Sequence, residues 1–230
     1  FKEAGLALRA LEERRSSTFT RESLGPEGPP RTDYPLEVSL FDLLAPRDCA
    51  SCGQAARLAF CPRCFPALVP APERSVAGVP VLSVATYRDP VDRAIARLKF
   101  ESRPALARGL GRLLMPALRG LDHQWVVPVP LHATRLAERG YNQAALLARA
   151  LADTRPCSTR ALVRRRPTSQ QALLDRHARA HNVSGAFVAR PGSGLNGRRV
   201  LLVDDVVTTG STARECMAAL ARVGARVVAV

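Results

Sequence analysis

The sequence contains almost no lysine, since only Lys2 and Lys99 are lysines among its 34 basic residues. Aromatic residues make up 5% of the chain, which argues against an all-β sandwich. No apolar run approaches the roughly 18–20 residues of a membrane span, so membrane insertion is not expected. Residues 1–17 carry acids and have no continuous apolar stretch, which excludes a secretory signal peptide there. Together these absences predict a cytoplasmic protein.

Arginine is correspondingly abundant, and the net charge is +14 at pH 7. A bias toward arginine reflects a GC-rich genome as readily as it reflects a function. The functional interpretation is a surface that attracts the phosphates of nucleotides or nucleic acid. The length of 230 residues and the hydrophobic content of 47% suffice for one ordinary domain with a small accessory module.

Three segments differ in composition. Residues 1–35 are rich in Gly, Pro and Ser and are typical of a disordered extension, whereas residues 36–72 hold four cysteines and end in prolines. From residue 79 to residue 230, strand-like segments alternate with helical segments of ten or more residues. This alternation predicts an α/β fold with a doubly wound parallel sheet. The predicted strands cover residues 79–87, 125–130, 160–165, 198–207 and 226–230, and the predicted helices cover 89–100 with Asp89 as N-cap, 103–120, 140–153 and 211–225.

The ends of the chain carry an expectation of their own. The sequence begins with Phe rather than Met, and its last predicted strand runs to Val230. We therefore expect either a piece of a longer protein or a start from a misassigned reading frame.

Four of the six cysteines form two pairs, Cys49 with Cys52 and Cys61 with Cys64. A two-residue spacer lets both thiolates of a pair reach one ion in tetrahedral geometry, which favours structural zinc. An iron-centred site, redox-active pairs and disulfides are the alternatives, although disulfides are rare in a cytoplasmic protein. With four protein ligands no coordination position stays open, so the predicted role is stability rather than catalysis.

The stretch “VLLVDDVVTTGST” places two acids directly after an apolar strand. In a parallel sheet ligands bind at the carboxyl ends of the strands, where Asp204 and Asp205 would lie. Two carboxylates can accept hydrogen bonds from the hydroxyls of one sugar or hold magnesium through water. The small residues that follow can form a nest of backbone N–H groups at a helix N-terminus, which suits a phosphate. A plain strand with a capped helix and a receiver-type acidic pair are the alternatives.

The same stretch resembles the phosphoribosyl pyrophosphate (PRPP) motif of type I phosphoribosyltransferases. Three further blocks resemble the competence protein ComF family (ComF/GntX-like) and follow the same order as in that family. They are “LLAPRDCASCG” with “CPRC”, “YRDPVDRAIARLKF” and “VVPVPLHATRLAERGYNQAALLARAL”. The similarity extends from about Leu40 to the end of the chain. It implies a type I phosphoribosyltransferase-like domain over residues 79–230, preceded by a small zinc-ribbon module over residues 36–72.

The resemblance implies site residues and cofactors. It implies that Asp204 and Asp205 bind the ribose hydroxyls and that magnesium binds together with PRPP. The implied 5′-phosphate ligands are Thr208, Thr209, Gly210, Ser211 and Thr212. The implied candidates of the pyrophosphate-side loop are Arg135, Arg139 and Asn142. A helix–turn–helix surface with solvated arginines is the alternative for this second group.

By the same resemblance, the arginine-rich middle of the chain lies where phosphoribosyltransferases carry a mobile loop. Gln171, Leu174, Arg179 and Asn182 fit the register of ComF-like sequences, whereas His177 and the residues around it depart from that register. Seven arginines fall between residues 155 and 179, which makes this segment a candidate polyanion surface. A solvated loop or helix face is an equally good interpretation.

Three functions follow from these observations. The resemblance implies a ComF-type protein that binds PRPP or a related ribose phosphate and acts on single-stranded DNA during natural competence, together with competence-machinery proteins. The second is a working phosphoribosyltransferase on a nucleobase or another small acceptor. The third is a non-catalytic module that senses a nucleotide. No residue stands out as a general base, so no catalytic residue is predicted.

Overall fold

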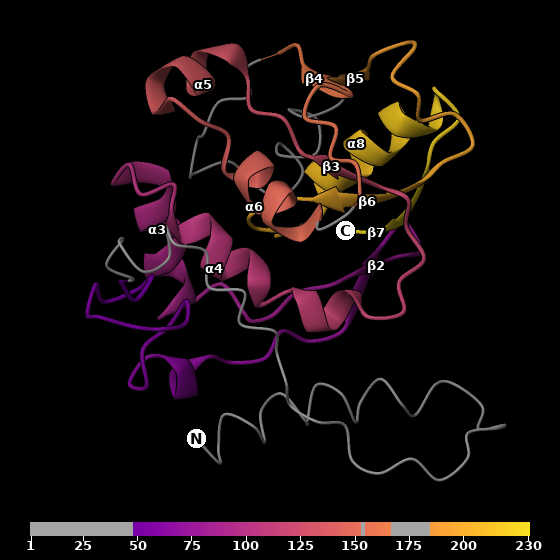
Figure 1. Cartoon of the computed structure of the whole chain (residues 1–230). Helices are drawn as coiled ribbons and strands as arrows, with labels where there is room; N and C mark the ends of the chain where they lie inside the picture. The colour runs from indigo at the N-terminus through magenta and orange to yellow at the C-terminus, as the bar shows by residue number, and fades with distance from the viewer. Residues whose placement is uncertain (1–47, 153–154, 167–184) are drawn as a thin grey trace, which may run out of the picture.

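The computed structural model describes residues 48–152, 155–166 and 185–230. Its centre is a three-stranded parallel sheet in the order β3 (Trp125–Pro128), β6 (Arg199–Val203), β7 (Arg226–Ala229), shown in Figure 1. The predicted parallel sheet of the α/β class is therefore confirmed.

Short segments extend both edges of this sheet. On the β7 side, the N–H of Leu82 donates to the carbonyl of Val230 at 2.7 Å, so that β2 (Val79–Val81) lies beside β7. β2 also pairs antiparallel with β1 (Arg74–Val76). On the β3 side, Cys157 forms an isolated bridge with Val126.

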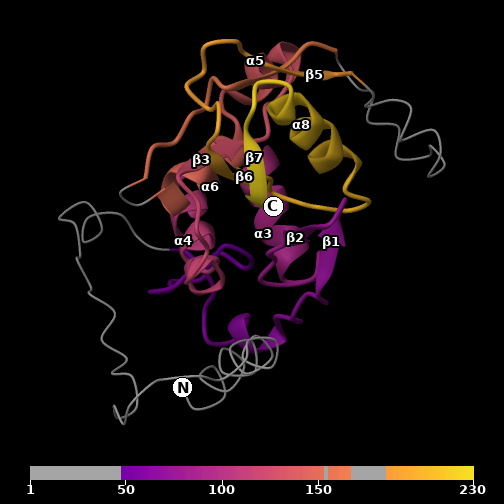
Figure 2. The ribbon, with the colours of Figure 1, turned by 90° about the vertical axis from the view of Figure 1, so that its right-hand side faces the viewer.

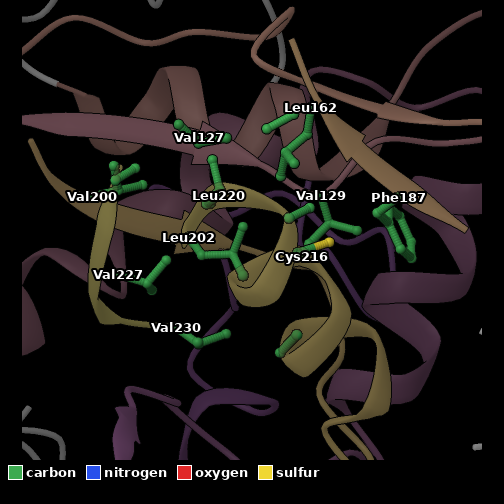
Figure 3. Packing of buried hydrophobic residues seen from close by; sticks show 14 of the residues in the cluster. Val127, Val129, Leu162, Phe187, Val200, Leu202, Cys216, Leu220, Val227 and Val230 are labelled. Carbon is green, nitrogen blue, oxygen red and sulfur yellow. The ribbon is translucent and has the colours of Figure 1, made fainter. Parts of the chain in front are cut away.

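The side chains of the central strand alternate between two hydrophobic cores. Val200 and Leu202 belong to one core, and Leu201 and Val203 belong to the other. A strand covered on both faces reads as a continuous apolar run, which is why “VLLV” carries no polar residue. Figure 3 shows Val200 and Leu202 within the first core, together with the thiol of Cys216.

Helices cover both faces of the sheet. One face carries α8 (Ser211–Ala221) with the antiparallel pair β4 (Leu162–Arg164) and β5 (Phe187–Ala189). The other face carries α3 (Val91–Phe100), α4 (Leu106–Arg112) and α6 (Gln143–Ala152). Figure 2 shows α8 on one side of the strands and α4 with α6 on the other. The remaining short elements are η1 (Phe65–Ala67), η2 (Met115–Leu118) and α5 (Ala133–Arg139).

The cysteine segment joins the second of these cores. Cys49, Cys61 and Cys64 are buried in the same cluster as Ile95 and Leu98 of α3. Figure 1 shows the indigo segment that contains them against α3 and α4. The segment therefore packs on the helices of the sheet domain.

Several predicted elements differ from those observed. Asp89 is not the N-cap of α3; Pro90 takes that position, and the Asp89 carboxylate pairs instead with Arg93. The strand predicted over residues 79–87 is only three residues long, and Pro80 in its centre lacks the N–H that a fully paired strand needs. The helix predicted over 103–120 divides into α4 and η2. No described helix is both long enough and apolar enough to cross a bilayer.

Candidate functional site

The two acids lie directly beyond the carboxyl end of β6, as the sequence predicts. Their backbone leaves the sheet after Val203, and both side chains are half-buried. Asp204 lies on the α8 side, where its charge acts on Cys216 of α8 and Arg164 of β4. Asp205 lies on the α3 side, where it meets Lys99. The pair therefore straddles the end of the central strand.

Burial shapes the electrostatics of Asp204. Burial and the neighbouring Asp205 carboxylate raise the pKa of Asp204 to about 8. The backbone N–H of Asp205 donates to Asp204 Oδ1 at 2.9 Å, and this hydrogen bond lowers the pKa by a smaller amount. Only one of the two carboxylates is thus readily ionised at this edge near neutral pH. Ionisation of the second requires a compensating cation or a ligand.

Lys99 supplies the cation on the Asp205 side. Its ammonium forms an ion pair with Asp205 Oδ2, and the exposed fractions of the two side chains are 21% and 15%. Asp205 Oδ2 is shielded from solvent and, within the described residues, makes no regular hydrogen bond besides this ion pair. An oxygen in that position retains the capacity to accept from a sugar hydroxyl or to bind a cation.

The turn after the acids is held by the β1–β2 hairpin. The guanidinium of Arg74 donates to the carbonyl of Val207 at 3.1 Å and also to the carbonyl of Thr208. Gly210 adopts a φ of +76°, and a Cβ there would lie 2.4 Å from Cγ2 of Val76. Glycine is therefore required at this position by both its backbone conformation and the contact with the hairpin.

Helix α8 begins in this turn, and the N–H of its first residue, Ser211, donates to the Thr209 hydroxyl at 3.4 Å. Gly210 is its N-cap residue and makes no side-chain capping hydrogen bond. Thr208 and Thr209 are exposed, while Ser211 and Thr212 are half-buried. The Thr209 hydroxyl donates to the hydroxyl of Ser211 at 3.1 Å. A helix N-terminus lined by hydroxyls is a suitable site for a phosphate, because its first N–H groups and its dipole both favour an anion.

The candidates for the pyrophosphate-side loop lie after β3, on and around α5. Asn142 Nδ2 donates to the carbonyl of Val129 at 2.9 Å, and its Oδ1 accepts from the N–H of Ala144, so this side chain caps α6. Arg139 donates to Gln143 Oε1 at 2.8 Å, and Arg135 is exposed and pairs with Glu138. This geometry is a helix–turn–helix, and the pyrophosphate role of the three residues stays a prediction.

The mobile-loop candidates fall outside the described residues. Gln171, Arg179 and Asn182 lie between residues 167 and 184, for which the structure gives no description. Their assignment therefore also stays a prediction.

The four predicted metal ligands come together. The Sγ atoms of Cys49, Cys52, Cys61 and Cys64 lie within 4.8 Å of one another, and those of Cys52 and Cys61 are 3.6 Å apart. Tetrahedral zinc with bonds of about 2.3 Å separates its sulfurs by about 3.8 Å. All six cysteines are free, so the alternative of disulfides finds no support. The cluster can bind a metal such as zinc.

The pKa values of two of these thiols also fit a bound cation. Burial would raise the pKa of Cys49, but hydrogen bonds to the surrounding backbone outweigh it and lower that pKa to about 6. Burial and the neighbouring thiols raise the pKa of Cys64 to about 12. One thiolate therefore opposes the ionisation of the next, and a bound dication removes this conflict.

Two residues of the site were not found from the sequence. Lys99 belongs to a helix more than a hundred residues before the acid pair, and Arg74 to a strand that was not predicted. Lys99 lies within the block “YRDPVDRAIARLKF”, but neither that resemblance nor the rarity of lysine gives this residue a role at the site.

Comparison with known proteins agrees with this geometry. A family model described as a phosphoribosyl transferase domain matches residues 136–230. Competence protein F of Haemophilus influenzae is 34% identical over 157 residues, which cover 64% of this chain and 69% of that protein. The DNA utilization protein YhgH of Salmonella typhimurium is 35% identical over 201 residues, covering 79% of this chain and 87% of that protein.

The chain belongs to the ComF family. The resemblance seen in the four sequence blocks is thereby confirmed. Orotate phosphoribosyltransferase of Parvibaculum lavamentivorans is 52% identical over 46 residues, or 20% of this chain and 24% of that enzyme. The ComF-family chain thus combines a phosphoribosyltransferase domain with a four-cysteine cluster.

We predict that the ComF-family chain holds one zinc ion and that Cys61→Ser loses it. Losing the metal should remove about 3 kcal/mol or more of stability, which lowers the unfolding midpoint by about 10 °C. Elemental analysis and thermal unfolding measure the two effects. Cys157→Ser, which changes a cysteine outside the cluster, should retain the metal. Iron in the purified protein, or full zinc content in Cys61→Ser, would contradict the assignment.

A second prediction concerns the buried acid. Because the pKa of Asp204 is about 8 when folded and 3.8 ordinarily, the unfolded chain loses this proton at lower pH than the folded one. Stability should therefore fall as pH rises from about 4 to 8, and the loss is complete above 8. Asp204→Asn should raise the unfolding midpoint strongly at pH 9 and by a much smaller amount at pH 5, where only the first part of the loss has occurred.

The control for this variant is Asp122→Asn. Asp122 is an exposed carboxylate that pairs with Arg199 at the other end of β6. Its substitution should produce no gain that grows with pH. Parallel pH profiles of wild type and Asp204→Asn would show that the acid is not buried as described.

Proposed function

We propose that this ComF-family chain binds PRPP or a related ribose phosphate, together with magnesium, between the acid pair and the N-terminus of α8. The observation that carries the proposal is the arrangement of Asp204, Asp205 and the N-terminus of α8 around one strand end. A phosphoribosyltransferase domain implies a ligand of this type. The acid pair suits the vicinal hydroxyls of the ribose, and the turn from Thr208 to Thr212 suits its 5′-phosphate.

The residues present also fit magnesium. Mg²⁺ prefers oxygen ligands and usually binds through one or two carboxylates together with phosphate oxygens of the substrate. The shielded Oδ2 of Asp205 and the charge-sensitive carboxyl of Asp204 offer that chemistry. Bound magnesium would neutralise the pyrophosphate and hold the ligand in one orientation.

The site can support either catalysis or sensing. Transfer of a phosphoribosyl group depends mainly on positioning and on stabilising positive charge as it develops on the ribose, and less on a general base. The acid pair could supply such stabilisation. Release of pyrophosphate in the presence of a nucleobase would identify an enzyme, and binding without turnover would identify a sensor.

We predict that PRPP with Mg²⁺ binds the wild-type protein and that the double variant Asp204→Asn, Asp205→Asn loses at least about 100-fold in affinity. The reason is the loss of two charge-assisted hydrogen bonds, each worth about 1.5–3 kcal/mol. Calorimetry measures both proteins, with their folded state checked by circular dichroism. Asp122→Asn is the matched control and should bind as wild type does. A folded wild type that releases no heat with the ligand would refute the nucleotide site.

The DNA role rests on a different part of the molecule. Relatives of this chain are named a DNA utilization protein and competence protein F. The exposed Arg165 and Arg190 line one cavity of about 250 Å³ beside the β4–β5 pair. We propose that Arg165 and Arg190 contribute to a surface that binds single-stranded DNA. We further propose that the protein acts in DNA uptake with other proteins of the competence machinery.

The matching prediction distinguishes DNA binding by these two arginines from non-specific attraction by the net positive charge of the protein. Arg165→Glu with Arg190→Glu should weaken binding of a single-stranded oligonucleotide and reduce its salt slope by about 1.4, since each phosphate contact contributes about 0.7 on single strands. Fluorescence anisotropy at several salt concentrations measures both quantities. Arg164 is not a suitable target, because it is half-buried over the ring of Phe187.

The control makes the same change of charge elsewhere. Arg222 and Arg226 are exposed at the end of α8 and the start of β7, away from the carboxyl edge of the sheet. Arg222→Glu with Arg226→Glu should reduce DNA affinity much less. Equal losses in both double variants would leave only non-specific attraction by net charge.

A further inference from the structure

Lys99 is an unusual residue in this chain. Of 34 basic residues only two are lysines, and Lys99 is the one that touches the acid pair. Arginine serves at nearly every other basic position, including those that bind carbonyls and carboxylates on the surface. An ammonium differs from a guanidinium because it is a compact point charge that can pair with one oxygen in a narrow space. The basic residue next to Asp205 is therefore a lysine in a chain that otherwise uses arginine almost throughout.

The helix that carries Lys99 is fixed on both sides of that residue. Arg97 donates to the carbonyls of Cys49 at 2.7 Å and Ala50 at 3.3 Å, which ties α3 to the cysteine segment. The Tyr141 hydroxyl donates to the carbonyl of Leu98 at 2.6 Å, which ties the same turn of α3 to the start of α6. Lys99 thus extends toward Asp205 from a backbone that has little freedom to move.

Any ligand that binds Asp205 Oδ2 must meet this ammonium. The ion pair occupies Asp205 Oδ2, the oxygen that is shielded from solvent. A ribose hydroxyl or a magnesium ion at this carboxylate would lie next to Nζ. The ammonium has three N–H donors, so it can keep Asp205 and still donate to an anionic oxygen of the ligand.

We propose that Lys99 is a ligand-binding residue of the phosphoribosyl site, holding Asp205 in the free protein and donating to an anionic oxygen of the bound ribose phosphate. This inference rests on the proposed function and adds to it a residue outside the domain matched by the family model. It assigns to α3, which the cysteine segment supports, a direct part in ligand binding.

Charge in the surroundings predicts a second effect of removing Lys99, on the pH at which the acid pair ionises. The groups facing Asp204 are Asp205 beside it, Lys99 from α3, Arg164 from β4 and Cys216 from α8. The Lys99 ammonium lowers the pKa of Asp204, so its removal should raise that pKa. Ligand binding that needs the ionised pair should then require a higher pH.

The experiment is calorimetry of PRPP with Mg²⁺ over pH 6–9 on the full chain. Lys99→Met should weaken binding at pH 7.5 by at least about tenfold, as expected for one lost charge-assisted hydrogen bond, and should move the pH midpoint of binding upward. Lys99→Arg should recover only part of the affinity, because its planar fork does not replace the compact ammonium. Unfolding midpoints show that the variants are folded, and Lys99→Gln, which removes the charge but keeps a side-chain donor, keeps the test valid if Lys99→Met is unstable.

Arg93→Met is the matched control. Arg93 lies on the same helix and pairs with Asp89 on the surface, so its removal should leave affinity and pH midpoint unchanged. If wild type binds and Lys99→Met binds equally well at pH values above its own pH midpoint, the contact between Lys99 and the ligand is refuted while the proposed function stands. Full affinity in Lys99→Arg would refute the need for an ammonium. Absence of binding by folded wild type would refute the proposed function, and this inference with it.

Discussion

The constraint on which the rest of the structure depends is the position of two carboxylates at the end of a strand buried on both faces. Val200 to Val203 alternate between two cores, and this alternation sends Asp204 and Asp205 to opposite sides of the sheet edge. Neither acid is fully hydrated there, so burial raises the pKa of Asp204 to about 8. The fold can keep this arrangement because Lys99 compensates Asp205. The protein alone compensates the charge and hydrogen-bonding capacity of the two carboxylates only in part. A cation or a sugar at this edge would supply the rest.

Helix α3 connects this edge to the cysteine cluster. Arg97 binds the carbonyls of the first cysteine loop, and Lys99, two residues later, reaches Asp205. Residues two apart on a helix point in different directions, which allows one short helix to contact both features. The four-cysteine segment is thus more than an appended module, because it supports the backbone from which a site residue extends. A metal that orders this segment would also fix the position of Lys99.

The local features of the molecule could be predicted from the sequence, and the features made by long-range packing could not. “VLLVDD” encodes a two-sided strand and its acids within six residues, and the cysteine spacing encodes the cluster. Nothing adjacent to Lys99 or Arg74 indicates that they meet residues 205 and 207–208, because only the tertiary fold sets those contacts. Asn142 shows the opposite limit: the motif around it was recognised, yet its amide caps α6, a role that the motif alone does not show.

The site extends beyond the segment that the phosphoribosyl transferase model matches. That segment begins at residue 136, whereas the contacts that hold the turn and the acid pair come from residues 74, 76 and 99. Val76 occupies the space that a side chain at residue 210 would need, and Arg74 binds the carbonyls just before it. The small β1–β2 hairpin therefore sets the shape of the turn. Residues before the matched domain are thus part of the candidate site.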